Sequence, residues 1–303
     1  MEKIKSKIND LEGFKELVVK RLGDFQPNFL GRHEEIMEEE KKGVRHFTSG
    51  VILPIHFSNN EEAPRFILTK RSKRVVQPGD LSFPGGHISM IDRLHGFFIA
   101  KGISPLARGR GFDAGWRSKK MGRKRGRGRG EKRIAANYLA CALRETAEET
   151  GFPMRKIDYL GSLPPYGMMS FRRVIFPSVG AITGELKERL NWEVERIVSF
   201  NIEEMLNPKN YFWIDFDVPE DLKKASNREE WKFPALIIED SVGREILWGA
   251  TFYIILSFMW IVLNFTMPEI PQDKVIKKDI PENYFTGGFK KLLKAGFERE
   301  GKK

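Results

Sequence analysis

The stretch that most constrains this chain is LRETAEETGF, residues 143–152. Read as a helix, it places Glu145, Glu148 and Glu149 at i, i+3 and i+4, so three carboxylates lie on one face within a single turn. Like charges at this spacing destabilise a bare helix, whereas a hard divalent cation binds a few carboxylates together with water and phosphate oxygens. The stretch is therefore either a solvated acidic face or a metal site for a phosphate-bearing substrate.

Apolar patterns on either side of this helix predict a mixed α/β sheet packed between helices. An amphipathic helix is expected over 1–22, followed by a polar linker to Lys42, and a second helix is expected from 135 to a stop at Gly151. A short helix is expected at 202–208. Strands are expected at 50–58, 64–72, 157–165, 173–182, 195–202, 211–216 and 233–240.

Positive charge is confined to one segment. The 303 residues carry 52 Lys and Arg against 41 Asp and Glu, a net charge of +11. Residues 93–133 hold fourteen of these bases and two of the acids, so the rest of the chain is close to neutral. This Gly- and Arg-rich segment lacks apolar periodicity, which predicts disorder or a mobile loop. It is either a solvated insert without a partner or a tract that contacts nucleic-acid phosphates.

Two further features concern membranes and compartment. Residues 246–265 contain no charged side chain and are long enough to span a bilayer. Polar Thr251, Ser257 and Asn264, and a strand directly before the run, favour a buried helix of the same domain, so no membrane span is expected. The single cysteine, Cys141, excludes an internal disulfide and is expected to be buried. Without a signal-peptide pattern, the protein is expected to be cytoplasmic. One short helix is expected within 289–297.

Two separated motifs resemble the halves of the Nudix box, Gx5Ex7REUxEExGU, in which U is apolar. ProGlyGly at 84–86 and Asp92 resemble the first half, with Asp in place of Glu, and residues 144–152 fit every fixed position of the second. Gly86 and Arg144 are 58 positions apart where the box has 14. The resemblance therefore implies an insertion of about 44 residues that coincides with the basic segment.

One branch of that superfamily is more similar than the rest. Residues 67–86, ILTKRSKRVVQPGDLSFPGG, are similar to the coenzyme A pyrophosphatase signature, LLTxR[SA]x3Rx3Gx3FPGG. The spacing from Ser72 to Gly79 is one residue short, so the second signature Arg has no exact partner and Arg74 is the nearest. The segments at 177–180, 191–194 and 246–251 also look like this branch. The resemblance covers roughly residues 45–265.

The resemblance implies a Nudix-type α/β/α sandwich with a mixed sheet, an N-terminal helix and a C-terminal helix. It divides the chain into an N-terminal helix and linker (1–42), a Nudix domain (43–265) interrupted by the basic insertion (93–135), and a tail (266–303). It also implies Mg²⁺ or Mn²⁺, which activates water against a diphosphate. The implied metal ligands are Glu145, Glu148, Glu149 and Gly86; the catalytic residues are Glu145, Glu148, Arg144 and Glu193; the substrate-binding residues are Arg71, Arg74 and Gly85.

The predicted function is metal-dependent hydrolysis of the pyrophosphate bond of coenzyme A or a CoA derivative. The products would be of 3′,5′-ADP and 4′-phosphopantetheine type. One alternative is a Nudix hydrolase of another nucleoside-diphosphate compound or of an RNA 5′ end or cap, with residues 93–133 binding nucleic acid. Another is a Nudix-like fold used only for binding, against which the intact REtxEExG argues. The oligomeric state is left open.

Overall fold

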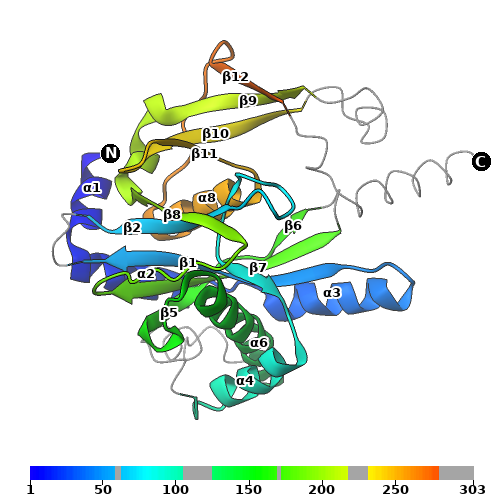
Figure 1. The fold of residues 1–303 in the computed structure, drawn as a ribbon. Coiled ribbons are helices and arrows are strands. Elements are labelled where there is room, and N and C mark those ends of the chain that lie inside the picture. Colours follow the sequence, from blue (N-terminus) through cyan, green and yellow to red (C-terminus); the bar gives the residue numbers. More distant parts are fainter. Residues whose placement is uncertain (59–62, 105–124, 169–171, 218–230, 280–303) are drawn as a thin grey trace, which may run out of the picture.

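A mixed eight-stranded sheet lies at the centre of the molecule (Figure 1). The computed structural model describes residues 1–58, 63–104, 125–168, 172–217 and 231–279. The strands of this sheet are β1 Phe47–Phe57, β2 Arg65–Arg71, β3 Leu81–Ser82, β4 Gly85–His87, β5 Ile157–Ser162, β6 Tyr166–Met168, β7 Arg173–Thr183 and β8 Val194–Asn201. Their order is β3-β2-β1-β7-β5, with β4 paired to β1, β6 to β7 and β8 to β2. The β1–β7 pair is parallel and the others are antiparallel.

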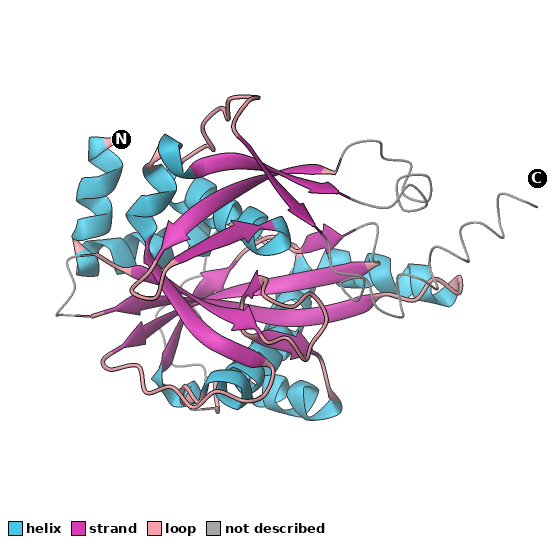
Figure 2. Cartoon of the chain, turned by 45° about the horizontal axis from the view of Figure 1, so that its top comes forward, coloured by secondary structure: helices cyan, strands magenta, loops and turns pink. Residues whose placement is uncertain are grey.

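Helices cover both faces of this sheet (Figure 2). On one face lies α6, Arg125–Thr150, and α4, Met90–Ala100, packs against it. On the other face lie α2, Leu11–Asp24, and α8, Gly249–Leu263. Strand β1 is buried from both sides, because Ile52 belongs to the core under α6 and Leu53 to the core under α2 and α8. The predicted α/β/α sandwich with a mixed sheet is confirmed.

A second sheet lies on the far side of α8 (Figure 1). It contains β9 Tyr211–Asp217, β10 Lys232–Glu239, β11 Arg244–Trp248 and β12 Val275–Asp279, in the order β11-β10-β9-β12. The uncharged run 246–265 is therefore divided: its first residues end β11, and most of the remainder forms α8, a helix buried between the two sheets. In the described ranges, no helix is both long and apolar enough to cross a membrane.

The N-terminal region differs from its prediction. The expected single helix over 1–22 is two helices, α1 Glu2–Asn9 and α2, because the Asp10 side chain accepts a hydrogen bond from the Gly13 backbone N–H and caps α2. The expected linker contains a helix, α3 Phe29–Lys41. The Glu131 carboxylate accepts hydrogen bonds from the first backbone N–H groups of α3, those of Phe29 and Leu30, at 2.6 and 2.7 Å. This cap comes from a distant part of the chain, so the local sequence did not reveal it.

The prediction of disorder for 93–135 is wrong at both ends. Residues 93–100 belong to α4, and residues 125–135 form the beginning of α6, ten residues before the predicted helix start. Residues 105–124, and the tail helix expected at 289–297, lie outside the described residues. Short 3₁₀ helices lie at Met154–Lys156, Ile202–Leu206 and Pro208–Asn210, and the second of them is the short helix expected at 202–208. The proposed domain boundaries stay a prediction.

Candidate active site

Two segments that are far apart in the sequence meet beside β1. Strand β4 pairs with β1 so that Gly86 lies opposite Gly50, and Gly50 also lies against α6. A Cβ on Gly50 would overlap the carbonyl oxygen of Tyr138, so only glycine allows this approach of strand and helix. A Cβ on Gly86 would overlap the Glu145 carboxylate. The ProGlyGly segment is thus in direct contact with the helix that carries the glutamates.

Glu149 is a buried carboxylate beside this glycine segment. Its side chain accepts a hydrogen bond from the Gly85 backbone N–H, and the residue is 8% exposed. Burial, and after it the charges of Glu145 and Glu193, raise the pKa of Glu149 to about 8, although the Gly85 bond and Arg71 act in the opposite direction. A negative charge at Glu149 is therefore poorly compensated, which is a condition that a bound cation relieves.

Arg144 holds three carboxylates in fixed positions. Its Nε and Nη2 atoms donate to the two oxygens of Asp92 at 2.8 and 3.0 Å. Nη2 also donates to Glu145 at 2.8 Å, and Nη1 donates to Glu148 at 2.9 Å. These bonds raise the pKa of Arg144, and the bond to Asp92 has the largest effect. Because guanidinium is planar and its donors point in fixed directions, the arrangement suits a residue that orients glutamates and does not contact substrate.

Asp92 joins the glycine segment to the acidic helix through an ion pair with Arg144. The residue is 0% exposed and belongs to a capping box at the start of α4, in which the Ser89 backbone N–H and hydroxyl donate to Asp92 at 2.8 and 2.7 Å. Burial alone would raise the pKa of Asp92, but the bonds from Arg144 and Ser89 outweigh it and hold the pKa below its ordinary value. Asp92 is therefore a buried anion with a full set of donors.

The acidic groups near Glu149 are of the chemical type that binds a hard divalent cation. Glu149 is buried, and Glu145 and Glu193 lie close enough to raise its pKa, so carboxylates converge where charge compensation is incomplete. In the described part of the chain, no three His, Cys, Asp or Glu side chains form a ready metal cluster, and Arg144 pairs with Glu145 and Glu148. The ligand set Glu145, Glu148, Glu149 and the Gly86 carbonyl therefore stays a prediction.

Of the two arginines predicted to bind substrate, Arg71 lies near Glu149 and Arg74 is exposed on a turn. Arg71, at the end of β2, lies close enough to Glu149 to lower its pKa, and its Nε donates to the Val76 carbonyl at 2.8 Å. Arg74 is exposed on the turn after β2. Sequence reasoning missed Arg173, the first residue of β7: burial and then Arg71 lower its pKa, and its Nε is buried without a hydrogen-bond partner. Arg71 and Arg173 together form a partly buried cationic pair.

Neither Cys141 nor the cavity of the structure is assigned a catalytic role. Cys141 is buried as predicted, its Sγ donates to the Gly86 carbonyl at 3.3 Å, and burial raises the pKa of the thiol to about 12, so it is a poor nucleophile. A cavity of about 600 Å³ lies at the opposite end of β1, between α2 and the end of β7. Lys15, His56 and Thr183 are among the residues that line it.

Residues 133–222 match the family model described as the NUDIX domain. This segment of the chain is similar to a NUDIX domain. The match supports the predicted superfamily and the predicted enzyme class, a Nudix pyrophosphohydrolase. The matched range includes 144–152 but not ProGlyGly or Asp92, so the insertion and the coenzyme A branch are outside what it supports. No curated protein matches the chain.

Solved Nudix structures resemble the chain at low identity. A MutT/nudix family protein from Enterococcus faecalis is 12% identical with a TM-score of 0.39, over 81% of this chain and 76% of that one. An Ap4A hydrolase from C. elegans is 11% identical with a TM-score of 0.32, over 51% and 80%. The NUDIX domain of Shewanella oneidensis NrtR, complexed with ADP ribose, is 13% identical with a TM-score of 0.31, over 57% and 85%.

Proposed function

We propose that this protein hydrolyses the pyrophosphate bond of coenzyme A or a CoA derivative and depends on Mg²⁺ or Mn²⁺. The observation that carries the proposal is the pair of carboxylates on the Gly85–Gly86 backbone: Glu145 lies against Gly86, and Glu149 accepts a hydrogen bond from Gly85. Glu193 and Arg71 lie near enough to Glu149 to shift its pKa, and Arg71 in turn affects Arg173. A diphosphate ester with a further phosphate offers several anionic groups to such a site. The choice of coenzyme A rests on the signature at 67–86.

The residues of the site have distinct roles in this proposal. Glu145, Glu148 and Glu149 hold the cation, and when bound it neutralises the diphosphate and activates water. Arg144 fixes the directions of Glu145 and Glu148. Glu193 is the candidate acceptor for the proton of the attacking water.

The hydrolysis itself breaks one phosphoanhydride bond. The water oxygen bonds to one phosphorus, the bridging P–O bond breaks, and two phosphate monoesters form. A substrate panel with each metal tests the proposal: CoA, acyl-CoA, NADH, ADP-ribose, diadenosine polyphosphates and capped RNA.

The panel should be repeated after residues 105–124 are replaced by a Gly/Ser linker of equal length. The replacement leaves α4 and the described start of α6 in place. We expect CoA compounds to be the best substrates of both proteins. Turnover of ADP-ribose without turnover of CoA would disprove the branch, and loss of RNA hydrolysis alone in the linker protein would favour the RNA alternative. No turnover of any compound would disprove the hydrolase proposal.

Arg173→Gln tests the anion-binding pair. We expect KM for CoA to rise by roughly tenfold or more, because a hydrogen bond to a charged group contributes about 1.5–3 kcal/mol. The melting temperature should not fall, since the substitution removes a partly buried cation whose buried Nε lacks a hydrogen-bond partner. Arg155→Gln, on an exposed 3₁₀ helix, is the matched control.

Steady-state kinetics with CoA and with 3′-dephospho-CoA show which phosphate group of the substrate Arg173 binds. If Arg173 binds the 3′-phosphate, the rise in KM disappears with the dephospho compound, and if it binds the diphosphate, the rise persists. An unchanged KM for both substrates would show that Arg173 does not bind the substrate.

Gly86→Ala tests the close approach of β4 to the helix. The new Cβ overlaps the Glu145 carboxylate, so this side chain must move. We expect kcat to fall roughly tenfold to a hundredfold, because a misplacement of about 1 Å in a catalytic group can cost about 10²-fold. Gly167→Ala in β6 is the control, since its Cβ would have no neighbour nearer than Arg32 Nη2 at 4.0 Å. Full activity of Gly86→Ala would contradict a precise requirement for the position of Glu145.

A further inference from the structure

Helix α4 turns an apolar stripe toward solvent. Residues 90, 94 and 98 follow one another at i, i+4 and i+8, and residues 91 and 97 flank them, so all five lie on one face. The residues buried on the other side of the helix are Asp92, Gly96 and Ile99. The large apolar side chains of the stripe and of the following turn are exposed by 40–88%: Met90, Ile91, Leu94, Phe97, Phe98 and Ile103.

This arrangement is the reverse of that in an ordinary surface helix, whose apolar face packs inward. Figure 1 places α4 at the edge of the molecule farthest from the second sheet. A contiguous exposed apolar patch on a soluble domain indicates a surface that meets a partner. The stripe faces away from Asp92, so a partner on it would leave the buried ion pair with Arg144 untouched.

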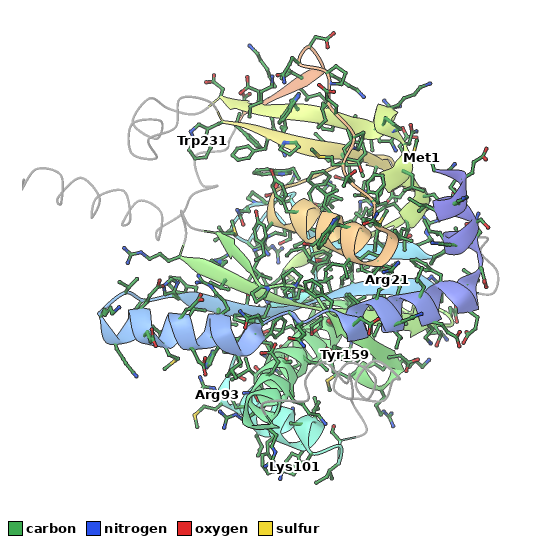
Figure 3. The ribbon with its side chains drawn as sticks, turned by 180° about the vertical axis from the view of Figure 1, so that it is seen from behind. Met1, Arg21, Arg93, Lys101, Tyr159 and Trp231 are labelled. Atoms are coloured by element: carbon green, nitrogen blue, oxygen red, sulfur yellow. The ribbon has the colours of Figure 1, made fainter. Side chains whose placement is uncertain are left out.

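Exposed bases lie on α4, just after it and on the neighbouring helix α6. Arg93 lies on α4 and Lys101 directly follows its last residue, both at one end of the molecule in Figure 3, and Arg129 and Arg133 are exposed on the neighbouring part of α6. The Lys101 ammonium lies 5.6 Å from the centre of the Phe97 ring, so charge and apolar surface are adjacent.

The acids of α4 and of α6 up to Arg133 are turned inward, whereas the exposed Glu34 and Glu40 of α3 lie near Arg93 and Arg133 around His33. Asp92 is buried against Arg144, and Glu131 is buried beneath the start of α3, where it accepts the backbone bonds of Phe29 and Leu30. Among the described residues of α4 and of α6 up to Arg133, neither acid therefore offsets the exposed positive charge.

We propose that α4 binds the surface of an anionic lipid bilayer. The apolar stripe would enter the boundary between headgroups and acyl chains, and the bases beside it would contact lipid phosphates and carboxylates. Burial of apolar side chains and attraction of basic side chains to anionic lipids each bind a protein only weakly to a membrane. Together they give stable attachment without a helix that spans the membrane. The helix would lie in the plane of the membrane.

Charge and side-chain chemistry favour a bilayer over the other partners. Two copies of the chain joined through α4 would bring two sets of exposed bases together, and like charges facing each other oppose such a symmetric contact. Single-stranded RNA is bound by aromatic stacking and polar groups. Phe97 and Phe98 offer rings for stacking, but most of the exposed apolar side chains of the stripe, Met90, Ile91 and Leu94, offer neither a ring nor a polar group.

Co-sedimentation with vesicles tests the proposal on the full chain. Wild-type protein is incubated with phosphatidylcholine vesicles with and without phosphatidylserine, over a range of salt. We expect binding to the anionic vesicles that weakens with salt. Leu94→Gln combined with Phe98→Gln should reduce it at least about tenfold, because both apolar contacts are lost. Lys101→Glu combined with Arg129→Glu should reduce it severalfold.

The control is Trp260→Gln, which changes a comparably exposed apolar residue on α8, 54% exposed, and should bind like wild type. Circular dichroism checks that every variant is folded. Equal binding by wild type and the Leu94 and Phe98 variant, or no binding to anionic vesicles, would overturn the proposal. Binding only after residues 105–124 are replaced by a linker would also overturn it for the intact chain.

Two further measurements address the competing partners. A doubled mass in solution that requires Leu94 and Phe98, without vesicle binding, would assign the stripe to a second copy and overturn the proposal. Salt-dependent binding of single-stranded RNA, unaffected by the Leu94 and Phe98 substitutions and not accompanied by vesicle binding, would do the same in favour of nucleic acid.

Discussion

Glu148→Gln is expected to reduce metal-dependent hydrolysis by at least about a hundredfold, since charge stabilisation by a catalytic cation contributes several kcal/mol and each 1.36 kcal/mol is about tenfold in rate. The substitution keeps the size of the side chain and removes one negative charge from the helix face. The Glu148 side chain is 56% exposed, and its bond to Arg144 is the more exposed part of the Arg144 network. Exposed ion pairs contribute about 0–1 kcal/mol, so the fold should be unaffected.

The measurement combines initial rates, titrated over Mg²⁺ and Mn²⁺, with thermal unfolding. Glu38→Gln is the matched control, because Glu38 is an exposed helical glutamate on α3, away from the site. We expect the control to keep the wild-type rate and both variants to keep the wild-type melting temperature. Wild-type turnover by Glu148→Gln would show that the ligand set is wrong, even if the protein is a hydrolase. A loss of activity accompanied by unfolding would contradict the exposed position of this side chain.

The strands could be predicted from the sequence because a buried strand is a recognisable run of apolar residues. Strands buried on both faces, such as β1 and β7, are continuous apolar runs, and the predicted limits fall within a few residues of the observed ones. The same holds for the acidic helix face, since the 3.6-residue period alone places Glu145, Glu148 and Glu149 together. Gly151 ends the helix where expected, with a φ of 76° that favours glycine.

Features that depend on distant contacts could not be predicted. Helix α3 buries only Phe29 and Ile36 and begins at a carboxylate from α6, so its own sequence resembles a polar linker. Arg173 is one of two consecutive arginines before a strand, a pattern without a motif, and its position near Arg71 follows from the strand order. The sequence predicted disorder around α4 because residues 93–133 as a whole are rich in basic residues and lack apolar periodicity. The helix forms nonetheless, and it packs through only one glycine, one aspartate and one isoleucine.

Asp92→Asn is expected to destabilise the fold by about 3–5 kcal/mol, the range for breaking a buried ion pair from one side. Asp92 accepts hydrogen bonds from Arg144 and Ser89 with both carboxylate oxygens, and an asparagine offers one acceptor and turns an NH₂ group toward these donors. The variant would also release Arg144 from its strongest partner, so the positions of Glu145 and Glu148 should become less well defined and activity should fall with stability.

The free energy of unfolding, measured with urea, provides the test. Glu185→Gln is the matched control, since Glu185 pairs with Lys187 in an exposed position and its loss should change little.

The pH dependence separates an ionic effect from a packing effect. The folded pKa of Asp92 lies below the unfolded value of about 3.9, so its contribution is fully present above that pH and is lost as the pH falls through the folded pKa. The difference between wild type and Asp92→Asn should therefore be constant near neutrality and shrink in acid below about pH 4. A difference that did not change with pH would mean that Asp92 acts through packing. A difference near zero would show that α4 and α6 are held together without this ion pair.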